Sequence, residues 1–439
     1  MARRVTRREM IGATALAGAG FWIGGCSPAP RKWSPNEKLN VACIGVGGRG
    51  ASNVDGMAGE NLVALCDVDD KRAAAAYKKY PGPKKYRDFR KMFDELGKQI
   101  DAVVVSTPDH THFHPAVRAM QMGKHLYCEK PMAHSVWEIR TMTRLARQKN
   151  LVTQLGTQHH AGDNIRRIVE LVRSGAIGEV REVYSWEGGD RGMPEIPAEF
   201  PPVPEHLDWD LWVGPAAFRP YHPAYCPYLW RFWWDFGTGE TGNMGCHILD
   251  FAYWALDLKH PVRVEASGPP VHSQTSPKSM KVRFEFPARG DRPPVTLHWS
   301  HEKEGPSILK ERGLPAGDSS YLGKFHSVIV GSKGMLLCAY GKHKLHPDAQ
   351  FAGFQYPAET IPKSPGFYQE WIDACKGGKP ATSAFDYSGP LAETVLLGNV
   401  AYRFGEPFEW DAGNLKAKGK PGADAFIHPP FRKGWEVDL

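Results

Sequence analysis

Two patterns of apolar residues divide the chain, and each predicts a different kind of sheet. In the first half, short apolar runs alternate with amphipathic stretches, which predicts buried parallel strands connected by helices. The expected strands are residues 39–44, 61–66, 100–106 and 125–128, and the expected helices are residues 70–80, 88–97 and 135–150. In the second half, residues 280–286 alternate strictly between apolar and charged side chains, which predicts a strand with one buried face.

The second half continues this period of two. Further strands are expected at residues 262–266, 295–299, 328–330 and 335–338, with a turn at 331–334, and helices at 164–174, 366–376 and 389–405. One face of this sheet should pack on helices, and the other should be free for a substrate or a partner subunit. The pattern predicts an α+β domain with a large, mostly antiparallel open sheet.

A glycine-rich turn, Gly45-Val46-Gly47-Gly48-Arg49-Gly50, follows the first expected strand. Gly45 permits the tight turn, Gly47 lets the backbone approach a pyrophosphate, and Gly50 lets the next helix pack against the strand. Asp67 ends the second strand, 17 positions after Gly50, where a carboxylate can accept hydrogen bonds from the adenosine ribose. Because a carboxylate repels a 2′-phosphate, NAD is favoured over NADP. The alternative is a glycine-rich turn in another α/β fold.

These patterns predict an α/β Rossmann N-terminal domain at residues 39–155 and the α+β domain at 156–411, with a tail at 412–439. Hydrophobic residues make up 42% and charged residues 23% of the 439, which is ordinary globular composition. The net charge is +7, of which +3 lies in the first 26 residues, and the remaining +4 is too small to suggest a nucleic-acid partner.

The first 26 residues form a pattern of their own. Thr6-Arg7-Arg8-Glu9-Met10 precedes a run of sixteen uncharged residues, shorter than the roughly 20 needed to span a bilayer. This resembles a twin-arginine (Tat) export signal, although a basic start before a buried helix is the alternative. Ile23-Gly24-Gly25-Cys26 resembles a lipobox, with Cys26 lipidated or cleavage nearby as the two options. We expect passage through the Tat translocase to the periplasm, then a tether at residues 27–38.

Seven cysteines follow Cys26, an odd count without a pairing pattern, which argues against a disulfide framework. His110, His112 and His114 alternate, as some metal ligands do. The glycine turn upstream favours a loop that lines a nicotinamide pocket instead, so no metal is predicted.

Two motifs connect the chain to a known family. Thr107-Pro108-Asp109-His110-Thr111-His112 and Glu129-Lys130-Pro131, on this predicted scaffold, resemble the Gfo/Idh/MocA oxidoreductases, the family of glucose–fructose oxidoreductase and inositol dehydrogenase. The motifs at residues 156–160 and 242–250 extend the resemblance over nearly the whole chain after the tether. The resemblance implies that Lys130 and His247 are catalytic and that the large sheet forms a homo-oligomer.

The chemistry fits this assignment. A lysine beside a positive nicotinamide should have a lowered pKa, so Lys130 can act as a base for alcohol oxidation or as an acid for ketone reduction. His247, expected in a glycine-rich turn before a helix at 248–256, is the second proton-transfer group. The alternatives are a surface lysine and a structural histidine. The family commonly has Asp where this chain has Asn243, and an amide can orient a hydroxyl but cannot take its proton.

The remaining candidates surround these residues. Residues 188–235 form a long Pro- and aromatic-rich segment without regular structure, in which the rings at 230–234 can stack on a sugar or simply pack. The predicted substrate-binding residues are Asn243, His160, Arg231 and Trp186. The predicted cofactor-binding residues are Gly45, Gly47, Arg49, Gly50, Asp67, Thr107, Pro108, His112, Glu129, Lys130 and Gln158.

Three classes of function remain open. The first is an exported NAD-dependent oxidoreductase that acts on a sugar, cyclitol or related polyol. The second is a glycoside-cleaving enzyme that uses bound NAD transiently, through oxidation and elimination. The third is a non-catalytic binding protein that contains NAD, which the loss of the Asp at position 243 slightly supports.

Overall fold

The computed structural model describes residues 34, 37–189, 191–302, 306, 311, 314 and 325–439. The predicted export signal, with Cys26, and most of the predicted tether lie outside these residues. Within the described part of the chain, no helix combines the length and the apolar character that a membrane span requires.

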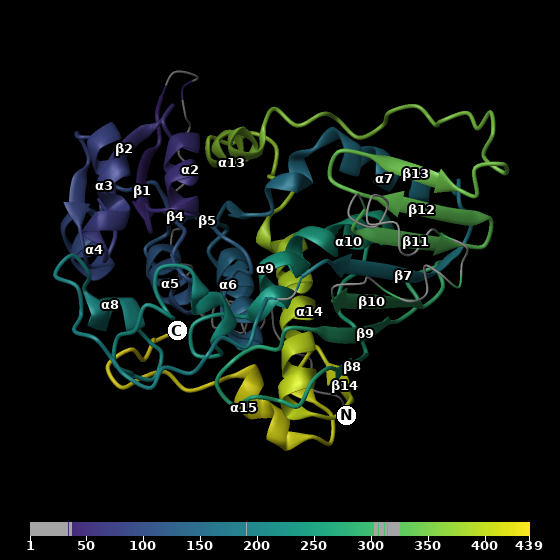
Figure 1. Cartoon of the computed structure of the whole chain (residues 1–439). Coiled ribbons are helices and arrows are strands. Elements are labelled where there is room, and N and C mark those ends of the chain that lie inside the picture. Colours follow the sequence, from purple (N-terminus) through teal and green to yellow (C-terminus); the bar gives the residue numbers. More distant parts are fainter. Residues whose placement is uncertain are drawn as a thin grey trace, which may run out of the picture. The chain divides into compact units, whose positions relative to one another are not determined.

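The N-terminal sheet has six parallel strands in the order β3-β2-β1-β4-β5-β6, which is the doubly wound Rossmann order (Figure 1). Its strands are β1 (Asn40–Ile44), β2 (Asn61–Cys66), β3 (Lys84–Tyr86), β4 (Ala102–Val105), β5 (His125–Cys128) and β6 (Thr153–Leu155). All four residues of β4 are buried, as a central strand covered by helices on both faces requires. The predicted Rossmann fold is confirmed.

Helices follow the strands and cover the sheet. They are α2 (Arg49–Gly56), α3 (Asp70–Lys79), α4 (Phe89–Leu96), α5 (Phe113–Gln121) and α6 (Val136–Gln148). The capping box predicted for α6 is present, because the Ser135 hydroxyl accepts from the Glu138 N–H while the Glu138 carboxylate accepts from the Ser135 N–H.

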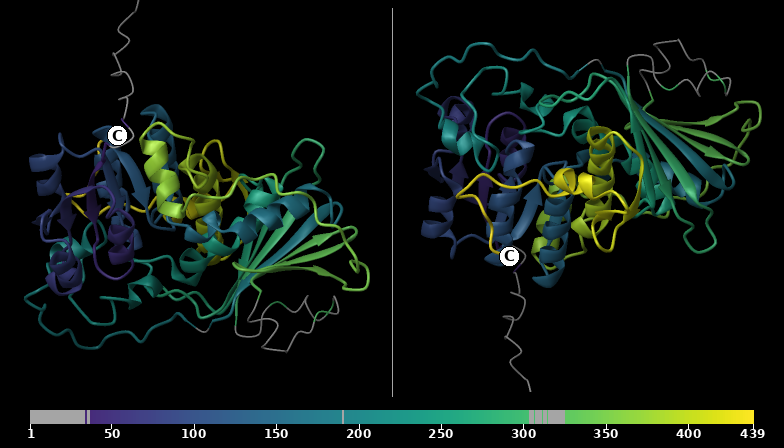
Figure 2. Two further views of the ribbon diagram at one scale, coloured as in Figure 1. Left: turned by 90° about the horizontal axis from the view of Figure 1, so that it is seen from above. Right: turned by 90° about the horizontal axis from the view of Figure 1, so that it is seen from below.

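The second sheet has nine strands in the order β13-β12-β11-β7-β10-β9-β8-β14-β15. It comprises β7 (Val180–Glu187), β8 (Arg263–Ser267), β9 (Met280–Phe286), β10 (Val295–His301), β11 (Ser327–Gly331), β12 (Gly334–Cys338), β13 (His343–His346), β14 (Phe408–Asp411) and β15 (Lys416–Ala417). Only β7 and β10 pair in parallel, so the prediction of a mostly antiparallel sheet is confirmed. The apolar residues of β9 are buried, and the views in Figure 2 show the helices gathered on one side of the sheet.

The helices of this half are α7 (Asp163–Arg173), α8 (Trp209–Val213), α9 (Gly239–Ile248), α10 (Asp250–Leu256), α13 (Phe367–Cys375), α14 (Phe385–Phe404) and α15 (Asp424–Ile427). The long helix α14 packs on α6, on α9 and on β8, and thereby joins the two sheets (Figure 1). It starts at Phe385 rather than at the predicted residue 389, and Pro390 therefore lies inside the helix, where its missing N–H removes one intrahelical hydrogen bond.

The long aromatic segment folds back on itself as a small hydrophobic cluster. Trp209, Trp212, Tyr225, Trp233 and Phe236 form its buried centre, together with Trp230. Packing therefore explains most of these rings, and Trp233, with no exposed surface, is not free to stack on a ligand. The seven described cysteines are all buried, with free thiols.

Candidate active site

A cavity of about 370 Å³ opens at the carboxyl ends of the N-terminal strands. Its volume is within the usual range of ligand pockets. Ten of the predicted site residues line it: Gly45, Gly47, Arg49, Asp67, Thr107, Pro108, Glu129, Lys130, Arg231 and Asn243. The aromatic segment and the C-terminal tail supply the opposite wall, through Trp212, Trp230 and Trp435. Residues from four distant parts of the sequence thus meet around one space.

The glycine turn at one end of the cavity is packed as tightly as the sequence predicts. A Cβ atom on Gly50 would lie 1.9 Å from the Gly45 carbonyl oxygen, and one on Gly45 would lie 2.7 Å from the backbone of Ser106. Gly45 also has a φ of +78°, which favours glycine. Helix α2 begins at Arg49, within this turn, so its free N–H groups lie beside the cavity.

Asp67 lines the same end of the cavity but has a second role. One carboxylate oxygen accepts from the N–H of Val46 at 2.8 Å and from that of Gly47 at 3.2 Å, and the other accepts from the N–H of Asp69 at 3.0 Å. Burial raises its pKa, against these hydrogen bonds. Since two carboxylate oxygens have about four acceptor positions, one remains for a ribose hydroxyl. Asp67 therefore fixes the turn as well as facing the ligand.

Glu129 joins the cavity wall to the protein interior. One of its oxygens, Oε1, accepts from Arg49 at 3.3 Å, Asn53 at 3.0 Å, Tyr127 at 3.2 Å and Gln158 at 2.9 Å. Four donors on one buried carboxylate fix the backbone that leads into the next residue, Lys130. Gln158, predicted to touch the cofactor, acts here through Glu129 and does not line the cavity.

The cavity fits the NAD that the turn predicts. The Thr107 hydroxyl is buried at the cavity wall with no protein partner, which leaves a polar atom for a ligand. Arg49 is half exposed above the turn and offers a positive charge to a phosphate. His112, in contrast, is buried with Nε2 2.8 Å from the Thr107 carbonyl oxygen, and does not line the cavity. It supports the Thr107 loop from behind.

Lys130 lies at the inner end of the cavity and is held by α9. Its Nζ donates to the Asn243 side-chain oxygen at 2.8 Å and to the Asn243 backbone oxygen. Burial lowers the pKa of Lys130, opposed by the negative charges of Asp109 and Glu129 and assisted by Arg231. A lysine with a lowered pKa and fixed geometry is suited to proton transfer.

His247 is on the same face of α9 as Asn243, one turn further on. The expected glycine-rich turn is wrong at this point, because residues 239–248 are helical and the predicted helix at 248–256 is a separate one, α10. Small residues let α9 approach its neighbours closely, as Gly245 does against Val395. Burial lowers the pKa of His247 well below its usual value, and the positive Lys130 lowers it further. The imidazole is therefore neutral, with Nδ1 buried and unpartnered.

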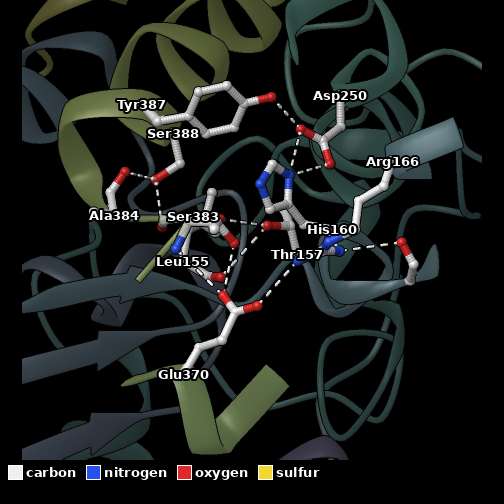
Figure 3. A network of polar contacts seen from close by, with 12 residues as sticks. Leu155, Thr157, His160, Arg166, Asp250, Glu370, Ser383, Ala384, Tyr387 and Ser388 are labelled. Atoms are coloured by element: carbon white, nitrogen blue, oxygen red, sulfur yellow. Dashed lines mark hydrogen bonds and ion pairs between the residues drawn. The ribbon is translucent and has the colours of Figure 1, made fainter. Parts of the chain in front are cut away.

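Two predicted substrate-binding residues do not reach this cavity. His160 is 1% exposed, with Nδ1 2.8 Å from Asp250, and lies in the buried network of Figure 3 with Tyr387 and Arg166. Trp186 is 3% exposed and belongs to a hydrophobic cluster with Val328. His160 lies in the turn at Gln158–Ala161 and Trp186 on β7, and both side chains face the interior.

The sequence analysis missed several residues at the site. Asp109 is buried beside Lys130 and accepts from the Thr238 hydroxyl at 2.6 Å, which joins its loop to the start of α9. Tyr368 reaches across from α13 to Arg49. Glu240 precedes Asn243 on α9, and the Asn243 amide donates to it. Asp109 was within a quoted motif, but no sequence signal points to Tyr368.

The three alternating histidines have separate positions. His110 has its ring nitrogens 3.1 Å and 2.9 Å from the carbonyl oxygens of Phe236 and Trp212, and His114 contacts the Trp435 carbonyl oxygen at 2.8 Å. Burial lowers the pKa of His110 to about 3 and that of His114 to about 4, so both are neutral. Within the described ranges, no group of three or more His, Cys, Asp or Glu side chains is arranged to hold a metal ion.

Comparison with family models identifies both halves. The model of the Gfo/Idh/MocA oxidoreductase family for its NAD-binding Rossmann fold matches residues 39–157, and the model for its C-terminal alpha/beta domain matches residues 162–291. Together the two models cover more than half of the chain.

Curated relatives match parts of the chain. A glycosyl hydrolase family 109 protein from Solibacter usitatus is 32% identical over 198 residues, which are 40% of this chain and 44% of that protein. Levoglucosan dehydrogenase from Pseudarthrobacter phenanthrenivorans is 24% identical over 50% of this chain and 52% of its own length. Inositol 2-dehydrogenase from Salmonella typhimurium is 27% identical over 36% and 48%. The chain thus matches about half the length of each of these proteins.

Solved structures match over a longer span. The WlbA dehydrogenase from Bordetella pertussis, crystallised with NADH and UDP-GlcNAcA, superposes with a TM-score of 0.60 at 15% identity, over 85% of this chain and 99% of that one. The aldose-aldose oxidoreductase from Caulobacter crescentus, complexed with glycerol, gives 0.55 at 18% identity, over 85% and 100%. At these identities the likeness shows the fold alone.

Proposed function

Because the chain belongs to the Gfo/Idh/MocA family of NAD-binding oxidoreductases, we propose that it interconverts a secondary alcohol and a ketone on a sugar, cyclitol or related polyol, with NAD held tightly. The observation that carries this proposal is the position of Lys130, at the inner end of the cavity, with a lowered pKa and two oxygen acceptors from Asn243. The names of relatives such as levoglucosan dehydrogenase and inositol 2-dehydrogenase support the substrate class.

The glycine turn, Asp67, Arg49 and Thr107 would hold the cofactor, which supplies the hydride acceptor or donor when bound. Lys130 takes the proton of the substrate hydroxyl, and the two Asn243 oxygens hold its N–H groups so that its lone pair can face that hydroxyl. The neutral His247 lies one turn beyond Asn243 on α9 but does not line the cavity, so its role in orienting a second hydroxyl stays a prediction.

Two measurements test this function. Mass spectrometry of the purified protein under native conditions should find one bound NAD per chain. A panel of free sugars and cyclitols, followed at the absorbance of NADH, should find at least one substrate whose oxidation Lys130→Ala abolishes. A protein that carries no nucleotide, or whose Lys130→Ala variant turns over normally, would contradict the proposal.

We also propose that the protein is exported folded, with NAD already inserted, and works in the periplasm. The support is the twin arginine at Arg7 and Arg8 before an uncharged run. Fractionation of cells should find the protein outside the cytoplasm, and the double change of Arg7 and Arg8 to Lys should retain it inside. Cys26→Ala should release it from the membrane fraction if Cys26 is lipidated.

A second candidate function is glycoside cleavage by oxidation and elimination, and the relatives named as glycosyl hydrolase family 109 proteins favour it. Oxidation acidifies a neighbouring C–H, a base removes that proton, and the glycosidic oxygen leaves with a proton from an acid. Addition of water to the unsaturated ketone and return of the hydride to the carbonyl carbon would then complete hydrolysis with no net change in NAD. Burial and the nearby Glu240 raise the pKa of Glu187 to about 7, as an acid needs, but Glu187 does not line the cavity. Release of nitrophenol from nitrophenyl glycosides, without net NADH, would separate this function from the first.

A further inference from the structure

One face of α9 carries three polar side chains in consecutive turns: Glu240, Asn243 and His247. Glu240 is 1% exposed, and both of its carboxylate oxygens lie 3.4 Å from the Asn243 side-chain nitrogen. Arg191 donates to the same carboxylate from the aromatic segment. A continuous chain of polar contacts therefore runs from Arg191 through α9 to Lys130.

The chemistry of the chain fixes the orientation of the amide. A carboxylate only accepts hydrogen bonds, so the Asn243 nitrogen must face Glu240. A lysine with its N–H groups turned inward only donates, so the Asn243 oxygen must face Lys130. The amide is oriented from both sides, and neither neighbour tolerates the flipped form.

We propose that Glu240, clamped by Arg191, is a positioning residue that holds Lys130 through Asn243, and that Glu240 and Asn243 form a matched pair of one carboxylate and one amide. The inference deepens the proposed function and rests on it, since it takes Lys130 as the base. It also explains why position 243 is an amide here. A second carboxylate at 243 would lie about 3.4 Å from the first, and two such groups cannot both be ionised without repulsion.

Three variants test the match. Asn243→Asp adds the unfavourable carboxylate, Glu240→Gln removes the original one, and the double variant exchanges the two groups. We expect each single change to lower kcat about tenfold, with a smaller effect on KM, and the exchange to recover to within about threefold of the wild type. Independent structural damage predicts instead that the two losses multiply.

A second readout does not depend on a substrate. Acetic anhydride acylates only the neutral amine, and mass spectrometry of the peptide that contains Lys130 gives the pH of half-maximal labelling. The charged groups that face Lys130 come from the Asp109 loop, from Glu129 and from Arg231, with Cys246 and His247 on α9. Asn243→Asp should move the labelling midpoint upward by about one pH unit, and the exchange should move it part of the way back.

The same shift predicts a distinctive activity profile. If Asn243→Asp acts by protonating Lys130, its loss of activity should shrink as the pH rises, whereas misfolding would give a loss at every pH. Arg191→Met, at a half-exposed position, loosens the clamp without removing a buried group, and should lower kcat about threefold. Glu409→Gln, an exposed change on β14, is the matched control and should alter nothing.

The outcomes separate cleanly. An unchanged labelling midpoint in Asn243→Asp, or an exchange variant no better than Asn243→Asp alone, overturns the inference. Should Glu240→Gln fail to fold, Asn243→Asp and Arg191→Met still decide the question. Normal turnover of Lys130→Ala would instead remove the proposed function, while the labelling result would still report whether Glu240 and Asn243 control this lysine.

Discussion

Two clusters of buried polar side chains, one on α9 and one that begins at Asp250 of α10, are neighbours in the sequence but differ in kind. Asn243 lines the cavity and contacts Lys130, and His247 lies one turn further on α9 without lining the cavity. Asp250, three residues after His247, pairs with His160 in the closed network of Figure 3. In the first cluster burial shifts the pKa values and leaves His247 Nδ1 without a partner. In the second, Asp250 accepts from both His160 and Tyr387. The comparison indicates that the first cluster contributes to proton transfer and lowers the stability of the fold, whereas the second cluster contributes to that stability.

The largest effect should come from Lys130. Lys130→Met keeps most of the side-chain volume but removes the proton-transfer group, so kcat should fall about a thousandfold. The unfolding midpoint should change little, because the gain from removing a desolvated amine offsets the loss of its two hydrogen bonds to Asn243. Steady-state kinetics and urea unfolding of the same preparation measure both. Lys98→Met, an exposed change, is the control. A loss of stability equal to the loss of activity would place Lys130 in the second cluster.

Asp250→Ala should show the opposite behaviour. It leaves His160 and Tyr387 buried without their shared acceptor, which should lower the free energy of unfolding by about 3 kcal/mol. Turnover per folded molecule should stay within about threefold of the wild type. Urea unfolding gives the first quantity, and activity normalised to bound NAD gives the second. A selective loss of kcat with unchanged stability would make Asp250 part of the site.

Glu187 on β7, close to Glu240 of α9, allows the cost of burying an ionisable group in this region to be measured directly. Its pKa is raised to about 7, so between pH 4.5 and 7 the folded protein holds a proton that the unfolded chain has released. The stability of the wild type should therefore fall as the pH rises through this window. Glu187→Gln should reduce that fall by about 2 kcal/mol, since the side chain is mostly buried. Identical pH dependence in both proteins would show that Glu187 titrates normally.

Most elements of the fold could be predicted from local sequence patterns, and the others could not, because they depend on contacts between residues far apart in the sequence. The glycine turn, the buried strands and the capping box at Ser135 depend on neighbours within a few residues, and all are present. The strand β7 carries no strict alternation, because its residues pack on both faces, and it was not predicted.

The candidate site shows the same division. Lys130 and Asn243 were found from motifs, although 113 residues separate them. Whether His159 or His160 faces the site depends on how one turn is rotated against α9 and α10, which only long-range packing decides. Tyr368 lies 319 residues from Arg49, and no spacing rule connects two such positions.

The smallest expected effect concerns Tyr368, which could contribute either to holding NAD or to the stability of the fold. Its hydroxyl accepts from Arg49 at 3.2 Å and donates to Asn53 at 2.8 Å, and both of these residues also hold Glu129. Tyr368→Phe removes these two hydrogen bonds but keeps the ring against Tyr127, so the cost should be about 1 kcal/mol. If that cost falls on the cofactor end of the cavity, NAD should dissociate about fivefold faster in native mass spectrometry, with kcat unchanged. The exposed Tyr356→Phe is the matched control. An unchanged dissociation rate with a lowered unfolding midpoint would show that Tyr368 stabilises the fold and does not help to hold NAD. The contact between Arg49 and Glu129 would then also be a structural one.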